Sequence, residues 1–178
     1  MSDTNGVTFR HLLKMDWSQG HNQTIHNGIS RIGWFKGGKA ATWRDEDLGD
    51  QFVRKSVEWI RDNKDVPFFL FFAAQDIHVP RMPNERFQGA TSMGYRGDAI
   101  VELDDKVGSI INIIEELELS EHTMIIFCSD NGAYPIAASN APFRGYASEL
   151  FEGGIHVPGF AVWPGRIEPV DHREQIGG

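Results

Sequence analysis

The spacing of hydrophobic residues predicts two amphipathic helices in this chain. Between Asp45 and Asp62 apolar side chains recur at three- and four-residue intervals, and Asp45 or Asp47 is placed to cap the start. Gly97–Leu119 carries the longest such pattern. Its apolar stripe consists of Ile100, Leu103, Val107, Ile110, Ile114 and Leu117. Glu102 and its acidic neighbours lie largely off that stripe, so we expect them to face solvent.

Three shorter apolar runs predict strands. Val66–Ala74 (VPFFLFFAA) is apolar without alternation, as in a strand buried on both faces, and is too short for a typical helix. Thr123–Cys128 is apolar and β-branched, and Ile155–Trp163 reads as another strand with Pro158 at its start or edge. Residues 1–44 are polar and glycine-rich, and we expect an irregular segment there.

The order of these elements predicts an α/β core over residues 45–168. The strand at 66–74, the helix at 97–119 and the strand at 123–128 form a β-α-β unit at 66–128, with parallel strands and a right-handed crossover. His78 follows the first strand, and Asp130 and Asn131 follow the second. Parallel strands end at the same edge of a sheet, so we expect these three side chains to share one ligand site.

The residues that follow the second predicted strand suggest a metal site. Asp130 and Asn131 offer hard oxygen atoms of the kind that Ca²⁺ or Mg²⁺ prefers, and Gly132 allows close approach of a ligand. Asp-Asn-Gly is also ordinary turn chemistry. The residues by themselves leave both interpretations open.

Composition narrows the class of protein. The 178 residues fit one domain, and 40% hydrophobic content supports a buried core. The net charge of −8 argues against non-specific nucleic-acid binding and against an anionic membrane surface. The single cysteine, Cys128, excludes an intrachain disulfide and a cysteine zinc site, and we expect it to be a buried hydrophobe. No apolar run is long enough to span a membrane. The first residues lack the pattern of a secretion signal, so we expect an intracellular protein or a chain that begins downstream of its natural start.

Four stretches, in this order and spacing, resemble the sulfatases, in particular the arylsulfatase-like branch of the alkaline phosphatase superfamily. They read NGISRIGWFKGGKAATWRDEDL, VPFFLFFAAQDIHVPR, TMIIFCSDNGA and APFRGYASELFEGGIHVPGFAVWPGRI. The resemblance implies a three-layer α/β domain with a mainly parallel sheet. It also implies hydrolysis of sulfuric esters by a formylglycine nucleophile, made within a C-x-P-x-R motif, beside a bound Ca²⁺, with Mg²⁺ as the alternative ion. Such proteins are usually secreted, periplasmic or lysosomal.

The resemblance also suggests roles for particular residues. Asp130 and Asn131 match a pair of metal ligands, and His78 matches the histidine that contacts the sulfate or helps protonate the leaving group. Arg144, by its charge and not by the resemblance, is a candidate contact for the anionic substrate, and the alternative is that it forms a surface salt bridge. Two positions depart from the family, because Ala147 stands where a lysine is expected and His156 stands where an arginine is common.

Larger departures concern motifs that the 178 residues do not contain. There is no C-x-P-x-R motif, no early Asp-Asp metal pair and no G-K-x-H segment. We therefore expect the middle of a sulfatase domain whose full-length parent hydrolyses the sulfate ester of a small molecule or glycan, and which is inactive alone. The alternatives are a degenerate, non-catalytic binding module and a phosphate-ester or phosphonate hydrolase of the same superfamily. A truncated sheet would expose an edge, through which a homodimer could form.

Overall fold

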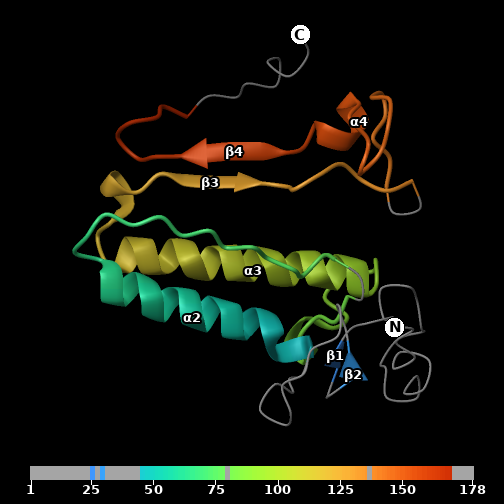
Figure 1. The fold of residues 1–178 in the computed structure, drawn as a ribbon. Helices are drawn as coiled ribbons and strands as arrows, with labels where there is room; N and C mark the ends of the chain where they lie inside the picture. Colours follow the sequence, from blue (N-terminus) through green and yellow to red (C-terminus); the bar gives the residue numbers. More distant parts are fainter. Residues whose placement is uncertain (1–24, 27–28, 31–44, 79–80, 136–137, 170–178) are drawn as a thin grey trace. The chain divides into compact units, whose positions relative to one another are not determined.

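The computed structural model describes residues 25–26, 29–30, 45–78, 81–135 and 138–169 (Figure 1). The expected irregular segment at 1–44 lies largely outside these residues. The chain divides into two compact units, Met1–Leu117 and Glu118–Gly178, which are described separately. The elements of the first unit are β1 (Ile25–His26), β2 (Ile29–Ser30), η4 (Asp45–Asp47), α2 (Leu48–Asn63), η5 (Glu85–Phe87) and α3 (Tyr95–Glu116). Those of the second are η6 (Ser120–His122), β3 (Ile125–Cys128), α4 (Glu152–Ile155) and β4 (Gly159–Val162).

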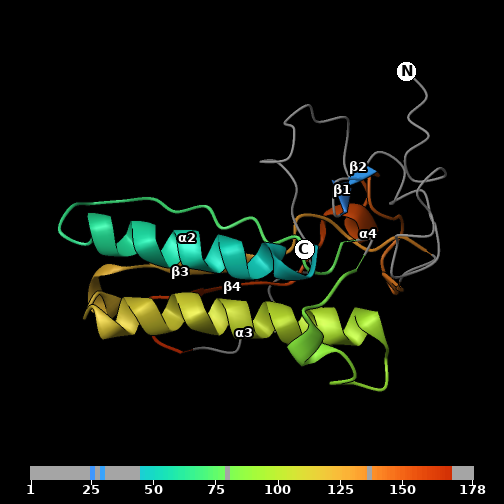
Figure 2. The ribbon, with the colours of Figure 1, turned by 90° about the horizontal axis from the view of Figure 1, so that it is seen from below.

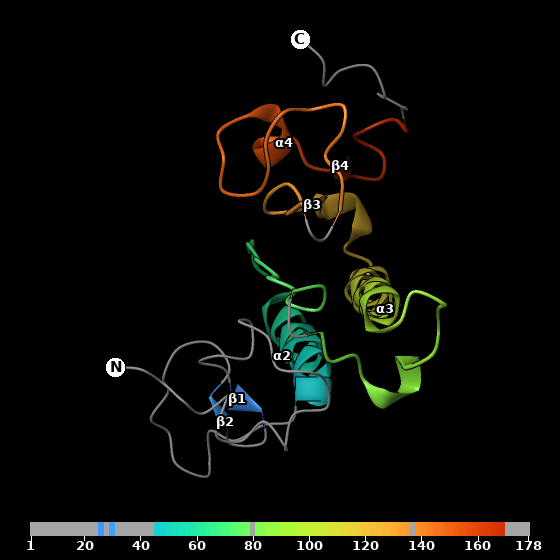
Figure 3. The ribbon, with the colours of Figure 1, turned by 90° about the vertical axis from the view of Figure 1, so that its right-hand side faces the viewer.

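Helices α2 and α3 lie side by side and form the centre of the first unit (Figures 1 and 2). Both were predicted from hydrophobic spacing, and both are confirmed with boundaries shifted by one to three residues. Asp47 occupies the N-cap position of α2, but its side chain makes no capping hydrogen bond. The two helices bury Ile60, Ile113 and Ile114 near one end, where Arg61 forms an ion pair with Glu116 at 2.9 Å. Figure 3 shows the same two helices nearly end-on.

The buried face of α3 differs from the predicted apolar stripe. Asp98, Glu102 and Lys106 are buried along one face of its N-terminal part and centre, whereas Ile100 is 46% exposed. The expectation that Glu102 faces solvent is therefore wrong. The physical reason is that Glu102 has polar partners on both sides, which compensate the cost of removing its charge from water.

The segment at 66–74 is neither helix nor strand in the structure. It runs as an extended chain with no strand paired to it, and Phe69 and Phe71 are 86% and 78% exposed. Phe68 alone of its aromatic side chains makes a ring contact with the helices, edge-on to Trp59 with centroids 5.5 Å apart. The predicted strand is thus not observed, because no backbone partner pairs with it in the described part of the chain, and neither is the predicted β-α-β unit.

The second unit contains a two-stranded antiparallel ribbon. Strand β3 pairs with β4 in the register Ile125 to Val162 and Cys128 to Gly159, and the rings of Phe127 and Phe160 stack 5.1 Å apart. The strand expected at 123–128 is confirmed as β3. The one expected at 155–163 is shortened to Gly159–Val162, because Ile155 ends α4 and residues 156–158 belong to neither element. All strand pairs that the structure describes are antiparallel.

Cys128 is exposed, so the expectation of a buried thiol is wrong. Among the described residues of the second unit, no further strand extends this two-stranded ribbon, and every residue of β4 is exposed. In the described residues no helix combines the length and apolar character needed to cross a membrane.

Candidate active site

The turn that follows β3 presents the predicted metal ligands at the surface. Asp130 and Asn131 are exposed, and neither side chain has a hydrogen bond or ion pair with another described residue. Their backbone is held on both sides, since Ser129 N–H donates to Pro158 at 3.1 Å and Gly132 N–H donates to Gly154 at 2.9 Å. The backbone of this turn is therefore fixed by hydrogen bonds, and the side-chain oxygens of Asp130 and Asn131 bond no other described residue.

Three glycines allow this turn to pack against the α4 region. A Cβ atom on Gly132 would lie 1.9 Å from the carbonyl oxygen of Gly153, a distance that no side chain can occupy. Equivalent atoms on Gly153 and Gly154 would lie 2.2 Å from the oxygen of Gly145 and 2.0 Å from that of Glu149. Close backbone approach thus explains why glycines follow Asp130-Asn131 and Glu152.

Asn140 organises the loop between these glycines. Its side-chain amide bonds the backbone of Ala133 and of Gly145. Asn140 is not among the site residues that were predicted from the sequence. The signal that could have found it is an amide side chain in a long polar loop, which readily bonds nearby backbone.

Arg144 lies on this loop with its guanidinium 3.9 Å from the centre of the Phe151 ring. No described carboxylate forms an ion pair with it, so the surface salt bridge that such an arginine commonly makes is not seen among the described residues. His156 stacks on Phe143 with ring centres 4.2 Å apart, and its Nδ1 lies 3.2 Å from Glu152. The loop therefore holds two cationic or titratable side chains against aromatic rings.

Ala147 occupies a tightly packed position. It is 5% exposed, and its N–H donates to the carbonyl of Ala133 at 3.3 Å. Ser148, next to it, has a positive φ of 74° and shares a hydrogen bond with the hydroxyl of Tyr134 at 3.2 Å. The described residues of this loop offer no lysine, and Arg144 is its arginine.

His78 is exposed in the first unit, at the end of a turn. Its N–H donates to the carbonyl of Gln75 at 3.0 Å, and Arg81 Nε donates to the carbonyl of Ile77 at 3.0 Å. Residues 79 and 80, which follow His78, lie outside the described chain. His78 and the pair Asp130-Asn131 belong to different units, so their convergence in one site also stays a prediction.

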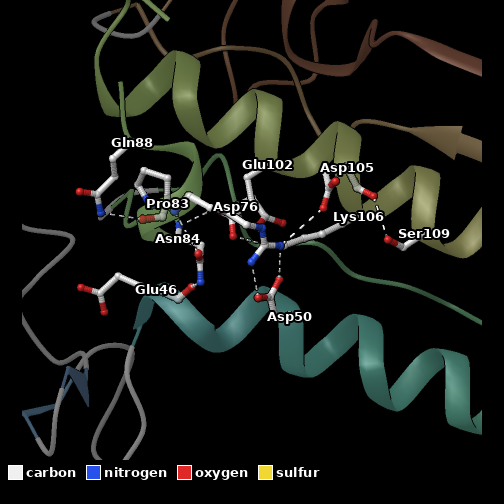
Figure 4. A network of polar contacts seen from close by, with 11 residues as sticks. Glu46, Asp50, Asp76, Pro83, Asn84, Gln88, Glu102, Asp105, Lys106 and Ser109 are labelled. Carbon is white, nitrogen blue, oxygen red and sulfur yellow. Dashed lines mark hydrogen bonds and ion pairs between the residues drawn. The ribbon is translucent and has the colours of Figure 1, made fainter. Parts of the chain in front are cut away.

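A buried charged cluster, which was not predicted from the sequence, includes Asp76 of the His78 turn. Lys106 forms ion pairs with Asp76 and with Glu102, whose other oxygen accepts the N–H of Asn84 at 3.1 Å (Figure 4). Burial raises the pKa of Glu102, and Lys106 acts in the opposite direction. A lysine four residues after a glutamate on a helix is the one sequence signal for it.

A second ion pair connects α2 to the segment after His78. Both terminal nitrogens of Arg86 donate hydrogen bonds to the carboxylate of Asp50. These bonds lower the pKa of Asp50, whereas its partial burial acts to raise it. In the described residues no group of three or more histidine, cysteine, aspartate or glutamate side chains could hold a metal ion. Asp130 and Asn131 are therefore a pair of candidate ligands and not a complete metal site.

Comparison with known proteins gives a consistent result. A family model described as Sulfatase matches residues 5–176. An N-acetylgalactosamine-6-O-sulfatase of Bacteroides thetaiotaomicron is 42% identical over 171 residues, which are 89% of this chain and 34% of that protein. The human N-acetylgalactosamine-6-sulfatase is 33% identical over 139 residues, or 75% of this chain and 27% of that protein.

Solved structures agree. One from work on the metabolism of multiple glycosaminoglycans by Bacteroides thetaiotaomicron superposes with a TM-score of 0.78 and 40% identity, covering 92% of this chain and 37% of that chain. The PsFucS1 sulfatase from Pseudoalteromonas has a TM-score of 0.64 and 32% identity, covering 79% of this chain and 30% of its own. This chain spans about a third of the length of the relatives it matches.

Proposed function

Because this chain belongs to the sulfatase family, we propose that it forms part of a domain that hydrolyses sulfuric esters. The observation that carries the proposal is the turn after β3, where Asp130 and Asn131 present unpaired oxygens on a backbone fixed by its neighbours. Preorganised oxygen donors of this kind suit a hard cation. Ca²⁺ is the expected ion, and Mg²⁺ is the alternative.

Asp130 and Asn131 supply two ligands, whereas Ca²⁺ takes six to eight oxygens. The remaining ligands would come from outside these 178 residues, which contain no early Asp-Asp pair. When bound, the ion supplies Lewis acidity and a template for the sulfate oxygens. The role of the chain itself is to hold the carboxylate and amide oxygens in place.

His78 and Arg144 are the proposed substrate contacts. His78 would donate a hydrogen bond to the sulfate or to the leaving oxygen, a role that its exposed position at the end of a turn permits. Arg144 would bind a sulfate oxygen, because its cation is fixed over Phe151 and no described carboxylate neutralises it. Arg144 would thus supply positive charge in a loop where Ala147 replaces the family's lysine.

The 178 residues contain no motif that could provide the formylglycine nucleophile. Formylglycine forms within C-x-P-x-R, which the sequence lacks, and Cys128 is followed by Ser-Asp-Asn-Gly. No residue of the described chain fits that group, so we assign no nucleophilic step to it. Ala147 and this missing motif favour, as a second candidate function, a non-catalytic sulfatase-like module that binds sulfated ligands.

The proposed substrate class is a sulfated glycan, and the named relatives suggest a 6-sulfated N-acetylgalactosamine. We further propose the three-layer arrangement with a mainly parallel sheet for the whole domain. The exposed phenylalanines at 69 and 71 and the bare ribbon β3–β4 are surfaces that additional layers would cover. An uncovered sheet edge would also allow a homodimer.

The test is a Ca²⁺ titration of the purified chain followed by amide NMR. Shifts should be confined to residues 129–132, with a dissociation constant of about 1 mM or weaker, since two ligands bind weakly. They should vanish in Asp130→Ala and persist in Asp104→Ala, which removes an exposed carboxylate from α3. An unchanged spectrum near Asp130 would contradict the proposal, as would tight binding.

A further inference from the structure

Lys106 is a buried lysine whose ammonium joins three segments of the first unit. It is 1% exposed, and its Nζ atom forms ion pairs with Asp76 and, at 2.8 Å, with Glu102 (Figure 4). Glu102 also accepts the N–H of Asn84, whose side chain donates to the carbonyl of Glu46 at 3.0 Å. A charge this deeply buried requires partners, and Lys106 has them from both flanking carboxylates.

The first turn of α2 leaves room for this ammonium. A Cβ atom on Gly49 would lie 1.6 Å from Nζ and 2.2 Å from Cε of Lys106. Glycine weakens a helix relative to alanine, so its presence here is explained by the space that the lysine occupies. The cluster is therefore built jointly by α2, by α3 and by the connection between them.

The same cluster reaches His78 through Asp76. The buried carboxylate of Asp76 and the exposed imidazole of His78 stand on one turn, closed by the hydrogen bond from His78 N–H to Gln75. The segment before this turn, residues 66–74, forms neither helix nor strand, so regular backbone hydrogen bonds do not fix it. The ion pair of Asp76 is thus a buried anchor of the turn on helix α3.

We propose that Lys106 is a positioning residue for His78, because through Asp76 it fixes the turn that presents the imidazole. This inference rests on the proposed function, in which His78 contacts the sulfate. Lys106 itself touches no substrate. Its effect on sulfate binding is transmitted through the backbone of Asp76, Ile77 and His78.

Substitutions of Lys106 and of Asp76 leave different charges buried, and this difference distinguishes a positioning role from a role in general stability. Loss of Lys106 leaves Asp76 and Glu102 as two buried like charges, which strains the helices as well as the turn. Loss of Asp76 leaves Lys106 paired one-to-one with Glu102, so the helices keep their neutral buried pair. Asp76→Ala should therefore release the turn without unfolding the helix pair.

The first experiment is native-state hydrogen exchange by NMR on the full chain. In Asp76→Ala and in Lys106→Met, the His78 amide should exchange about tenfold faster or more, while Ile113 in α3 changes by less than about threefold in Asp76→Ala. Asp104→Ala is the matched control, because it deletes an exposed carboxylate of the same helix, and it should change neither amide. Equal acceleration at His78 and Ile113 in Asp76→Ala would overturn the inference.

The second measurement titrates inorganic sulfate and follows the imidazole signals of His78. In Asp76→Ala the apparent dissociation constant at His78 should rise about threefold or more relative to wild type and to Asp104→Ala. An unchanged constant together with a released turn would overturn positioning. Wild-type His78 signals that do not respond to sulfate would instead contradict its proposed role in the active site, while hydrogen exchange still decides whether Lys106 fixes the turn.

Discussion

The side chain of Asn140 bonds both backbone groups of Ala133. Its Oδ1 accepts the Ala133 N–H at 2.9 Å, and its Nδ2 donates to the Ala133 carbonyl at 2.8 Å and to that of Gly145 at 3.2 Å. The amide thereby bonds the N–H and the carbonyl of Ala133 as the backbone of a neighbouring strand would. Ala133 immediately follows Asp130-Asn131-Gly132. A single side chain holds the ends of the loop together beside the proposed metal ligands.

Replacing Asn140 by alanine should loosen this loop. The variant loses three hydrogen bonds of a partly buried amide, so we expect the free energy of unfolding to fall by about 1–3 kcal/mol. Urea denaturation followed by circular dichroism measures it. Ser139→Ala is the matched control, because it removes one exposed hydrogen bond to Ala141, and its effect should stay within about 0.5 kcal/mol. Equal effects of the two substitutions would show that Asn140 does not organise the loop.

Gly132→Ala should damage the turn after β3 far more than alanine damages a glycine with open space. The new methyl group would meet the carbonyl of Gly153 at 1.9 Å, and backbone on both sides must move. Gly108→Ala in α3 meets nothing within 4 Å and should stabilise the helix by about 0.5–1 kcal/mol. Thermal unfolding and the Ca²⁺ titration of both variants provide the comparison. A Gly132→Ala chain with wild-type stability and Ca²⁺ response would contradict the close approach.

Asp98 should make stability depend on pH in the acid range. Its carboxylate accepts N–H groups from Gly89 and Thr91 at 2.9 Å each and the Thr91 hydroxyl at 3.2 Å. These bonds hold the pKa of Asp98 below its ordinary value of 3.8. A lowered carboxyl pKa stabilises the folded state above the ordinary value, and this contribution is lost as pH falls through the lowered one.

Melting temperatures of wild type and Asp98→Asn measured between pH 7 and pH 2 test this point. The difference between the two proteins should be constant near neutral pH and should shrink below about pH 4. A difference in melting temperature that does not vary with pH would mean that the charge of Asp98 does not contribute to stability.

The sequence predicted the elements whose hydrophobic residues pack against a neighbour in their own unit. Helices α2 and α3 and strand β3 are of this kind. It did not predict the burial of Glu102 and Lys106, because that burial depends on distant partners. Asp76, which pairs with Lys106, lies 30 residues away, and Asn84, whose N–H bonds Glu102, lies 18 residues away. The strand predicted at 66–74 also fails for a physical reason, since its apolar run requires a partner strand that the described chain does not provide.

The position of Asp130 and Asn131 in a turn after a strand was predicted from the sequence, and the structure places them there, after β3. Their role as metal ligands stays a prediction. The close approach of Gly132 to Gly153 and the bonds of Asn140 could not be predicted, because they depend on how a 20-residue loop folds back on itself. The convergence of His78 with the candidate ligands Asp130 and Asn131 was expected from a parallel sheet that the described residues do not form, and it stays a prediction.

The chain on its own should not hydrolyse a chromogenic aryl sulfate, even with Ca²⁺. It lacks the C-x-P-x-R motif and carries Ala147 at the lysine position, and loss of a nucleophile with its supporting groups leaves little beyond binding. Steady-state assay of the purified chain, with a metal-free control, measures this. Ca²⁺-dependent turnover above background would show that a nucleophile exists within these 178 residues.

The most direct test of the central claim is a chimera. Residues 5–176 would replace the matching segment of the Bacteroides thetaiotaomicron N-acetylgalactosamine-6-O-sulfatase, and release of sulfate from 6-sulfated N-acetylgalactosamine would be measured. We expect the chimera to release sulfate, with a turnover that falls about 100-fold or more in Asp130→Ala and is unchanged in Asp104→Ala. A chimera that unfolds at the temperature of the parent sulfatase but releases no sulfate would show that these residues do not support sulfatase activity. Turnover that does not change in Asp130→Ala would show that Asp130 is not a metal ligand.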